Sequence, residues 1–301
     1  MNGSIVNVET IKIEGLSKEG VRLLDKIADA TGGIFKPWQI VRVAKAQAKV
    51  KKIEAISQIE VTELHIRAYQ RFLNEEAKKQ DNIEKITSLA LPLLDGKAKP
   101  EDMDSDWITN FFDKSRLISD AQMQDLWSRI LAGEANNPGS YSKRTVNFMA
   151  SLDKEDAALF TKLCNFNCII NDLHPLVFDP SAEIYNKNGV NFGVLTHLET
   201  IGLISFDNLQ GYIFQSLPQK ILISYQDTPL ILEFIKPEEN TIEVGRVLLT
   251  GVGRDLARIC TTEKIIDFEA YIIRQWMNHG IRISSPYNYP PLNMTFMEKK
   301  K

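Results

Sequence analysis

Residues 38–80 read WQIVRVAKAQAKVKKIEAISQIEVTELHIRAYQRFLNEEAKKQ and contain neither glycine nor proline. Alanine, glutamate, glutamine and lysine are frequent in this stretch, and all four are strong helix formers. The stretch predicts a long helix that begins at Lys36-Pro37-Trp38, because proline is tolerated in the first turn of a helix. An unbroken helix over these residues would be about 65 Å long, which exceeds the width of a small domain.

The predicted long helix carries an apolar stripe at a spacing of three to five residues. Its members are Ile53, Ile56, Ile59, Leu64, Ala68, Tyr69 and Phe72. The irregular spacing does not establish a strict coiled coil. The stripe nevertheless needs a second surface to cover it, because apolar area is unfavourable in water. We therefore predict that the chain forms a homo-oligomer and contacts a protein partner through this helix.

The beginning of the long helix is strongly basic. Residues 36–52 contain six cations and no acidic residue, namely Lys36, Arg42, Lys45, Lys49, Lys51 and Lys52. Such a segment suits nucleic acid or an anionic membrane surface. Membrane binding is the weaker of the two alternatives, because the apolar face is mostly alanine and buries little area. We favour over both a solvated face on a helix that packs against another helix.

The composition is that of an ordinary globular protein. The 301-residue chain has 36 basic and 39 acidic residues, which give a formal net charge of −3. Its 44% hydrophobic and 25% charged residues exclude a disordered or collagen-like chain. The small net charge excludes a basic coat over the whole chain but not a local basic patch. Sixteen glycines and twelve prolines are fewer than average, which favours helix.

Three features predict a cytoplasmic protein with reduced thiols. The first thirty residues lack the basic start, apolar core and small-residue cleavage site of a secretory signal. No run approaches the roughly 20 apolar residues that cross a bilayer. The cysteines Cys164, Cys168 and Cys260 are odd in number and do not form a disulfide framework in so long a chain.

Changes in sequence texture divide the chain into five parts. They are an N-terminal arm and short helix (1–35), the long basic and amphipathic helix with a following helix (36–100), a helical motif domain (101–166), an α+β domain (167–280) and a flexible tail (281–301). The predicted fold class is mainly α, with a long N-terminal helix, a helical middle domain and a C-terminal α+β domain.

Capping residues and breakers set the expected helix ends. Ser17 is the expected N-cap of the first helix, and a second helix over Asn82–Leu94 follows the long one. Ser119 and Gln122 have the spacing of a capping box. The last helix is expected over Glu263–His279.

Strand-like runs dominate the sequence after residue 202. They are Leu203–Phe206, Gly211–Ser216, Lys220–Tyr225, Pro229–Ile235 and Thr241–Leu249. Turns with prolines separate these runs, as is typical of short antiparallel strands.

Aromatic residues are prominent in the helical motif domain. They are Trp107, Phe111, Phe112 and Trp127, and all lie at helical spacing. We interpret them as core residues, while a role in stacking a ligand is the alternative. Trp38, at the start of the long helix, is grouped with them as an interaction or core residue.

The same domain carries a set of motifs. These are D-W-x-x-x-F-F at 106–112, M-Q-x-L-W-x-x-I-L-A-G-E at 123–134 and P-G-S-x-S at 138–142. The set resembles an uncharacterised bacterial family known only as a domain of unknown function, over about residues 15–280. The family supplies no activity, so no catalytic residue is carried over. Proteins of this kind resemble accessory genes on mobile elements, which implies a role in phage defence.

A second resemblance lies nearer the C-terminus. Leu195-x-x-Leu198-x-x-Ile201-Gly202, followed later by Leu249-Thr250-x-x-Gly253-x-x-Leu256, is similar to a winged helix. The strands between Gly211 and Ile235 enlarge the wing. The helix at 191–202, which would read DNA in a winged helix, has no Lys or Arg. We therefore favour a wing domain used for packing or partner contact.

Two small clusters suggest ligand binding, and each has a simpler interpretation. Ser140, Ser142, Lys143 and Arg144 lie at an expected helix start, where a phosphate binds well, but capping and solvated charge explain them too. Cys164 and Cys168 are expected on one helical face with His174 nearby, as in part of a zinc site. Buried cysteines acting as small apolar residues are the favoured interpretation.

Three common phosphate-binding, metal-binding and nucleophile motifs are missing from the sequence. The phosphate-binding G-x-x-x-x-G-K-[ST], the metal-binding H-E-x-x-H and the nucleophile-bearing G-x-S-x-G are all absent. We predict no cofactor, no metal and no catalytic residue. The predicted function is a self-associating sensor or adaptor. Nucleic-acid binding through residues 36–52 and an enzyme with an unfamiliar site remain as alternatives.

Overall fold

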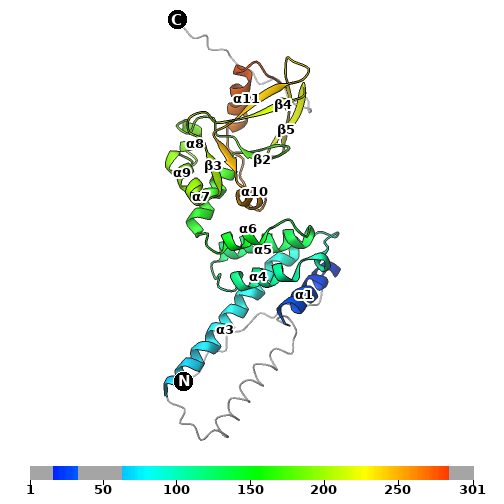
Figure 1. Ribbon diagram of the computed structural model, residues 1–301, viewed down its shortest axis with the longest axis vertical. Coiled ribbons are helices and arrows are strands. Elements are labelled where there is room, and N and C mark those ends of the chain that lie inside the picture. Colours follow the sequence, from blue (N-terminus) through cyan, green and yellow to red (C-terminus); the bar gives the residue numbers. More distant parts are fainter. Residues whose placement is uncertain (1–15, 33–62, 285–301) are drawn as a thin grey trace. The chain divides into compact units, whose positions relative to one another are not determined.

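The computed structural model describes residues 16–32 and 63–284 (Figure 1). The chain divides into two compact units, with the boundary in the sequence between Lys154 and Glu155. The first unit is helical in its described residues and the second mixes helices with small antiparallel sheets. This confirms a mainly helical chain with a C-terminal α+β region. The division differs from the boundary expected after residue 166, because α7 (Lys154–Cys164) packs within the second unit, where Thr161 Oγ1 lies 3.7 Å from Cys260 Sγ.

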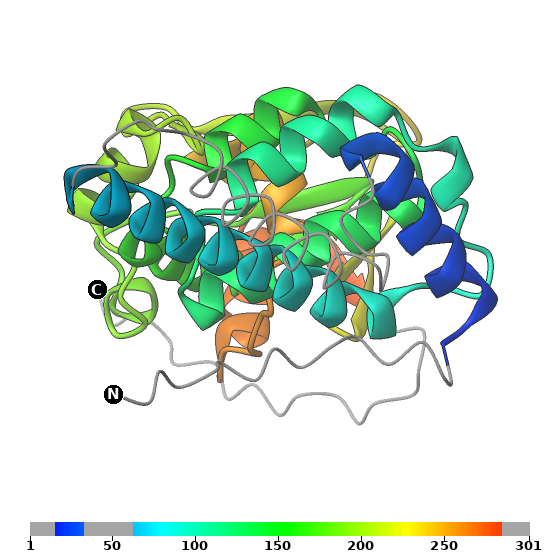
Figure 2. The same ribbon diagram turned by 90° about the horizontal axis from the view of Figure 1, so that it is seen from below.

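The first unit is a cluster of helices joined by short turns. The described helices are α1 (Lys18–Thr31), α3 (Glu63–Ala90), α4 (Ser105–Ser115), α5 (Ala121–Asn136) and α6 (Lys143–Met149), with short 3-10 helices at Leu91–Leu93 and Pro100–Asp102. Helix α1 packs on α4 and on the second 3-10 helix, and α3 packs on α5 (Figure 2).

Helix α3 is continuous where the sequence predicted a break between residues 80 and 82. The prediction of a separate helix over Asn82–Leu94 is therefore wrong. The buried Asn82 side chain is held from outside its own helix, since its Nδ2 donates to the Arg116 carbonyl (2.9 Å) and its Oδ1 accepts from Gln124 (3.2 Å). These bonds make a residue of modest helix propensity compatible with a helix interior. The helix ends before Pro92, which lies in the following 3-10 helix.

Side-chain caps fix the starts of α1, α4, α5 and α6 in the first unit. Ser17 caps α1, as the sequence predicted, and Ser142 caps α6, where the sequence left both Ser140 and Ser142 as candidates. Helix α5 is capped by Asp120, whose carboxylate accepts from the amides of Gln122 and Met123. The expected Ser119 cap is wrong by one residue, because Asp is an equally good N-cap and here begins the helix.

The second unit contains five helices among its described residues and all nine described strands. The helices are α7, α8 (Glu183–Asn186), α9 (Phe192–Thr200), α10 (Gly251–Ala257) and α11 (Phe268–Asn278). The strands are β1 (Asn167–Ile170), β2 (Asp172–Pro175), β3 (Ile204–Phe206), β4 (Tyr212–Leu217), β5 (Lys220–Tyr225), β6 (Thr228–Glu233), β7 (Asn240–Gly245), β8 (Val247–Leu249) and β9 (Arg282–Ser284).

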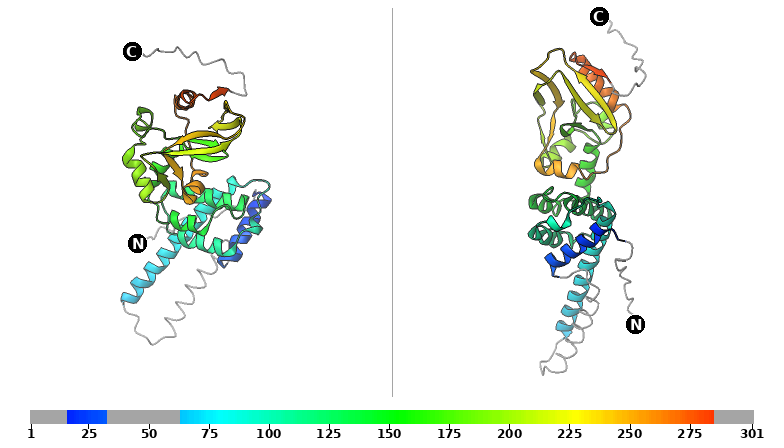
Figure 3. Two further views of the ribbon diagram at one scale, coloured as in Figure 1. Left: turned by 45° about the horizontal axis from the view of Figure 1, so that its top comes forward. Right: turned by 90° about the vertical axis from the view of Figure 1, so that its right-hand side faces the viewer.

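The strands form one five-stranded sheet and two two-stranded sheets. The large sheet has the order β2-β1-β5-β6-β9, while β3 pairs with β8 and β4 pairs with β7, and every named pair is antiparallel. Helix α11, orange in Figure 3, packs near the yellow strands through Phe268, whose ring centroid lies 5.0 Å from that of Tyr225. The core of this unit is aromatic around the fully buried Tyr185, whose hydroxyl donates to the Leu176 carbonyl at 2.8 Å.

Several strand expectations need correction. The run predicted as one strand over Thr241–Leu249 is two strands, because Gly245 adopts φ 92° and turns the chain between β7 and β8. Strands β1 and β2 were not predicted. Residues 282–284 form β9 against β6, although they lie in the segment expected to be a flexible tail. The last helix begins at Phe268 and not at Glu263, since Asp267 before it has φ 67°.

Candidate interaction surface

The four aromatic residues of the motif set are buried in the core of the first unit. The centroid of the Phe111 ring lies 5.1 Å from those of Trp107, Phe112 and Trp127. The Trp107 indole Nε1 donates to the Tyr141 carbonyl at 2.7 Å. All four side chains are nearly or wholly shielded from solvent. The cluster therefore holds α4 to α5 and offers no open ring face for a ligand.

Glu134, near the end of α5, binds the loop that contains the P-G-S-x-S motif. Its two carboxylate oxygens accept from the amides of Gly139 (2.7 Å) and Tyr141 (2.9 Å). Burial raises the pKa of Glu134, and the loop amides act in the opposite direction. The neighbouring Gly133 lies inside α5 and not at its end, and a Cβ there would fall 2.7 Å from the Tyr141 ring. Both residues thus have a structural explanation.

Lys143 and Arg144 lie at the start of α6, as the sequence predicted. The Lys143 Nζ is 3.8 Å from a carboxylate oxygen of both Asp104 and Asp106. The Ser142 hydroxyl is engaged in capping, at 3.2 Å from the Thr145 amide. Arg144 is exposed. The local charge is therefore balanced, and this helix start has little excess positive charge for a phosphate.

The predicted basic stretch lies outside the described residues. Its cations are Lys36, Arg42, Lys45, Lys49, Lys51 and Lys52, and Trp38 belongs to the same segment. What the structure does describe is the continuation of the chain, from Glu63 onward in α3.

The part of α3 before Asn82, about two-thirds of this 28-residue helix, has no buried residue. From Glu63 to Asp81 every side chain is exposed or half-buried, whereas buried residues recur from Asn82 to Ala90. Three large apolar side chains on this half face solvent, with exposed fractions of 64% for Leu64, 45% for Ile66 and 56% for Phe72. In Figure 1 this half, in cyan, extends away from α4, α5 and α6. We call residues 63–81 the free half of α3.

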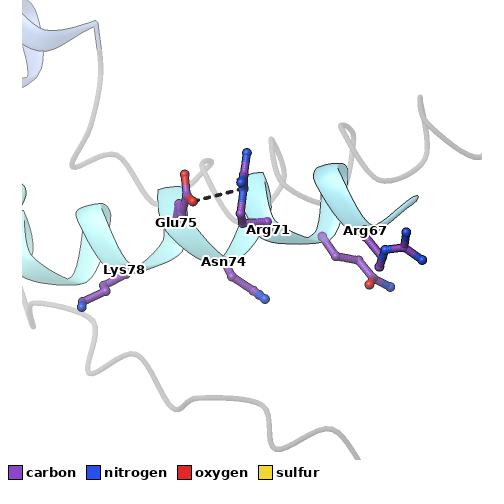
Figure 4. Close-up of a pocket in the computed structure, with 6 residues that line it drawn as sticks. Arg67, Arg71, Asn74, Glu75 and Lys78 are labelled. Carbon is purple, nitrogen blue, oxygen red and sulfur yellow. Dashed lines mark ion pairs between the residues drawn. The ribbon is translucent and has the colours of Figure 1, made fainter. Parts of the chain in front are cut away.

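The free half is amphipathic. Ile66, Tyr69 and Leu73 follow the three- and four-residue spacing of one helix face, with Phe72 beside them. Polar residues at the same kind of spacing occupy another face and line a hollow of about 470 Å³ (Figure 4). They are Arg67, Gln70, Arg71, Asn74, Glu75 and Lys78. Arg71 Nε pairs with Glu75 Oε1 at 3.4 Å.

This amphipathic pattern does not extend to a membrane span. No helix in residues 16–32 and 63–284 has both the length and the apolar character to cross a bilayer. The long α3 is rich in charged residues, and its apolar face is a stripe and not a whole surface. The apolar stripe of the free half is therefore suited to contact with a second protein surface on one side of the helix.

A model of the family described as "Protein of unknown function (DUF2806)" matches residues 66–273. The chain belongs to this family. The match covers more than half of the chain, from the free half of α3 to α11, and includes the whole motif set with its four buried aromatic residues. It confirms the resemblance to a domain of unknown function. Neither the curated proteins nor the solved structures contain a match to this DUF2806 protein.

The cysteines do not lie as the zinc alternative required. Helix α7 ends at Cys164, and Cys168 lies on β1, so the expectation of one shared helical face is wrong. Burial raises the pKa of both thiols, which keeps them protonated, and it lowers the pKa of His174. Within the described part of the chain no three His, Cys, Asp or Glu side chains are grouped as metal ligands.

Proposed function

We propose that this DUF2806 protein is a non-enzymatic interaction protein that self-associates through the free half of α3. The observation that carries the proposal is the exposure of Ile66 and Phe72 on the apolar face of a helix whose later residues, from Asn82 to Ala90, include five that are buried. Full burial of an exposed apolar side chain is worth about 1.5–3 kcal/mol, and these two side chains, which are already about half covered, contribute about half of that each. Two copies that pair the face of Ile66, Tyr69, Leu73 and Phe72 remove the exposed parts of two large apolar side chains, Ile66 and Phe72, from water in each copy. This offsets part of the association cost of about 4–15 kcal/mol.

The charges on the other face support a helix-to-helix contact. Ion pairs within the helix, Arg67 with Glu63 at 3.3 Å and Arg71 with Glu75 at 3.4 Å, remain in water while the apolar face is covered. A second copy presents the same apolar spacing, so a two-fold axis matches the stripe to itself.

The experiment is gel filtration with light scattering of the full chain over a range of concentrations. We expect a dimer or larger species for the natural chain. Phe72→Glu and Ile66→Glu should each weaken self-association by about tenfold or more, because each places a charge in the interface. The matched control is Leu209→Glu, at an apolar residue of the second unit that is 87% exposed. A natural chain that stays monomeric at every concentration contradicts the proposal.

We propose further that the protein acts in the bacterial cytoplasm as a sensor or adaptor of phage defence. The support for this role is the resemblance of the motif set to accessory genes of mobile elements. The test compares the efficiency of phage plating on cells that express the natural chain or the Phe72→Glu variant. Protection by the natural chain alone would support both parts of the proposal, and equal plating on all cells would contradict the defence role.

Nucleic-acid binding is a second candidate function, favoured by the polar face of the free half. Arg67, Arg71 and Lys78 follow in sequence after the basic residues 36–52, and Gln70 and Asn74 are side chains that contact bases. The experiment measures the affinity for duplex DNA and RNA against salt concentration. Neutralising several phosphates predicts an affinity that falls steeply with salt, and a flat salt dependence contradicts this function.

We infer that α9, β3, β8 and α10 form a winged-helix-like element used for packing. The pairing of β3 with β8 and the Thr250 cap of α10 support the likeness. Helix α9 has no Lys or Arg, and its His197 Nε2 lies 2.6 Å from Asp156 Oδ1 of α7. A map of the crosslinks that the full chain forms with duplex DNA tests this inference. Crosslinks between α9 and the DNA would contradict the packing role.

A further inference from the structure

The second unit has a hollow of about 640 Å³ on its surface. Its wall includes the loop after residue 178, the start of α9, the turn after β3 and the residue between β7 and β8. The side chains that matter here are Asp179, Asn186, Asn191, Phe192, Asn208 and Arg246. The volume lies within the range of about 300–1,000 Å³ that is usual for small-ligand sites.

Arg246 is held in place on both its backbone and its side chain. Its amide donates to the Val177 carbonyl at 2.7 Å, and its carbonyl accepts from the Asp207 amide at 2.9 Å. The Nη1 atom donates to the Asn208 carbonyl and, at 3.4 Å, to Asn208 Oδ1. The preceding Gly245 allows this arrangement, since a Cβ there would lie 2.5 Å from the Val177 carbonyl. The guanidinium is thus pre-oriented. Both of its hydrogen bonds to Asn208 are donated by the same nitrogen atom, Nη1.

Phe192 presents a large aromatic ring at the same hollow. The side chain is 52% exposed, although it lies only one residue into α9. Its ring centroid is 5.6 Å from that of Phe206, in an edge-on arrangement. The two rings meet at an interplanar angle of 68° and do not form a parallel stack. An aromatic face that is open to a hollow is suited to stacking a planar ligand.

The amide side chains at the hollow divide into donors and acceptors. Asn186 Nδ2 donates to the carbonyls of Ser181 (2.9 Å) and Ala182 (3.1 Å), so its Oδ1 is the free end. Asn191 Oδ1 accepts from the Val194 amide at 3.1 Å, so its Nδ2 is the free end. Hydrogen bonds from the Ser181 amide and hydroxyl lower the pKa of Asp179, which keeps that carboxylate ionised. The wall thus offers both hydrogen-bond senses beside one cation and one anion.

We propose that this hollow binds one nucleotide unit, with its phosphate on Arg246 and its base against Phe192. The planar guanidinium fork matches a phosphate, and the ring matches any base. The carboxylates of Asp179 and Asp207 both interact with Arg246 and oppose a second or third phosphate, so a monophosphate or one phosphodiester fits and a triphosphate does not. The site lies in the second unit and does not depend on self-association through α3.

The experiment is calorimetric titration of the full chain with the four ribonucleoside 5′-monophosphates, adenosine, inorganic phosphate, ATP and an eight-residue oligothymidylate. At least one monophosphate or the oligonucleotide should bind, and adenosine, phosphate and ATP should bind more weakly. Arg246→Gln should reduce affinity by about tenfold or more, since a charged hydrogen bond to phosphate is lost. Phe192→Ala should also reduce affinity, and because Phe192 is exposed this variant keeps the fold. The matched control is Arg254→Gln, at an arginine that pairs with Asp172 at 3.5 Å and does not line the hollow.

Each result decides the proposal. Tighter binding of a monophosphate identifies a free nucleotide as the ligand, and tighter binding of the oligonucleotide identifies single-stranded nucleic acid. Either result supports the proposal when Phe192→Ala weakens it and Arg254→Gln does not. The absence of binding by every ligand at millimolar concentration overturns the proposal. Tighter binding of ATP, adenosine or inorganic phosphate than of every monophosphate and the oligonucleotide also overturns it, and so does affinity that is unchanged in both Arg246→Gln and Phe192→Ala. None of these results bears on the oligomeric state.

Discussion

The free half of α3 and the half that follows it belong to one helix and differ in what covers them. Residues 82–90 place Ile83, Ile86 and Ala90 against the rest of the first unit, and α5 is the principal neighbour. Residues 63–81 continue the same helix with Leu64, Ile66 and Phe72 exposed. Helix formation is a local property and burial is a tertiary one, so an apolar stripe alone does not reveal which of its residues are covered.

The largest expected effect separates the two halves directly. Ile86→Asp places a charge at a position with no solvent exposure and should lower the free energy of unfolding of the first unit by about 3–5 kcal/mol. Phe72→Asp makes the same kind of change in the free half and should alter the free energy of unfolding of the monomer by only about 0.5 kcal/mol. Urea unfolding followed by circular dichroism measures both. A similar loss in the two variants would show that the free half is covered within one chain.

The second prediction concerns α5, the helix that covers the second half of α3. Gly133→Ala should lower the free energy of unfolding by about 1–3 kcal/mol, since its new methyl group meets the Tyr141 ring. This reverses the usual preference for alanine within a helix. Gly251→Ala in α10 is the matched control, because no atom lies within 4 Å of a Cβ built there. If Gly133→Ala proved neutral or stabilising in thermal melts, the stability of the first unit would not depend on the close approach of the Tyr141 ring to α5.

The sequence predicted the helical character of the free half because glycine and proline are absent from it and propensity acts locally. It did not predict that the helix continues through Asn82, because this depends on bonds to Arg116 and Gln124 that are distant in sequence. In the same way Glu134 resembles an ordinary surface acid until the loop that it binds is seen. At Asn82 and Glu134 the sequence shows only the type of residue, which does not reveal the groups that each side chain binds.

The second unit illustrates the same limit for the candidate site. The run around Arg246 has strand character on both sides, and a turn inside it depends on the contact of Gly245 with Val177. The Arg246 and Phe192 side chains meet one hollow only after β3, β7 and α9 are assembled. A glycine followed by arginine inside an apolar run was the only local signal, and it is common.

A smaller effect tests where α5 begins. Asp120→Ala should lower the free energy of unfolding by about 0.5–2 kcal/mol, because two amides lose their acceptor. Ser119→Ala should be nearly neutral, since no cap is formed by that residue. Thermal melts of the two variants, each against the natural chain, provide the comparison. A larger loss for Ser119→Ala than for Asp120→Ala would restore the capping box that the sequence predicted.

The smallest expected effect is a pH dependence at the other end of α5. Burial raises the pKa of Glu134 in the fold above its unfolded value of 4.5, so its contribution to the free energy of unfolding is complete below 4.5 and is lost as pH rises through the folded pKa. Glu134→Gln removes this titration. The melting temperature of the natural chain minus that of Glu134→Gln should therefore increase as pH falls from 7 to 4. A difference that decreases over this range would mean that the loop amides outweigh burial and that the carboxylate is favoured in its ionised form. The sign of the change thus shows whether burial or the hydrogen bonds from the loop amides dominate at Glu134. Glu134 lies on α5, the helix that packs against α3, so the same measurement reports on the contact that the covered residues of α3 depend on.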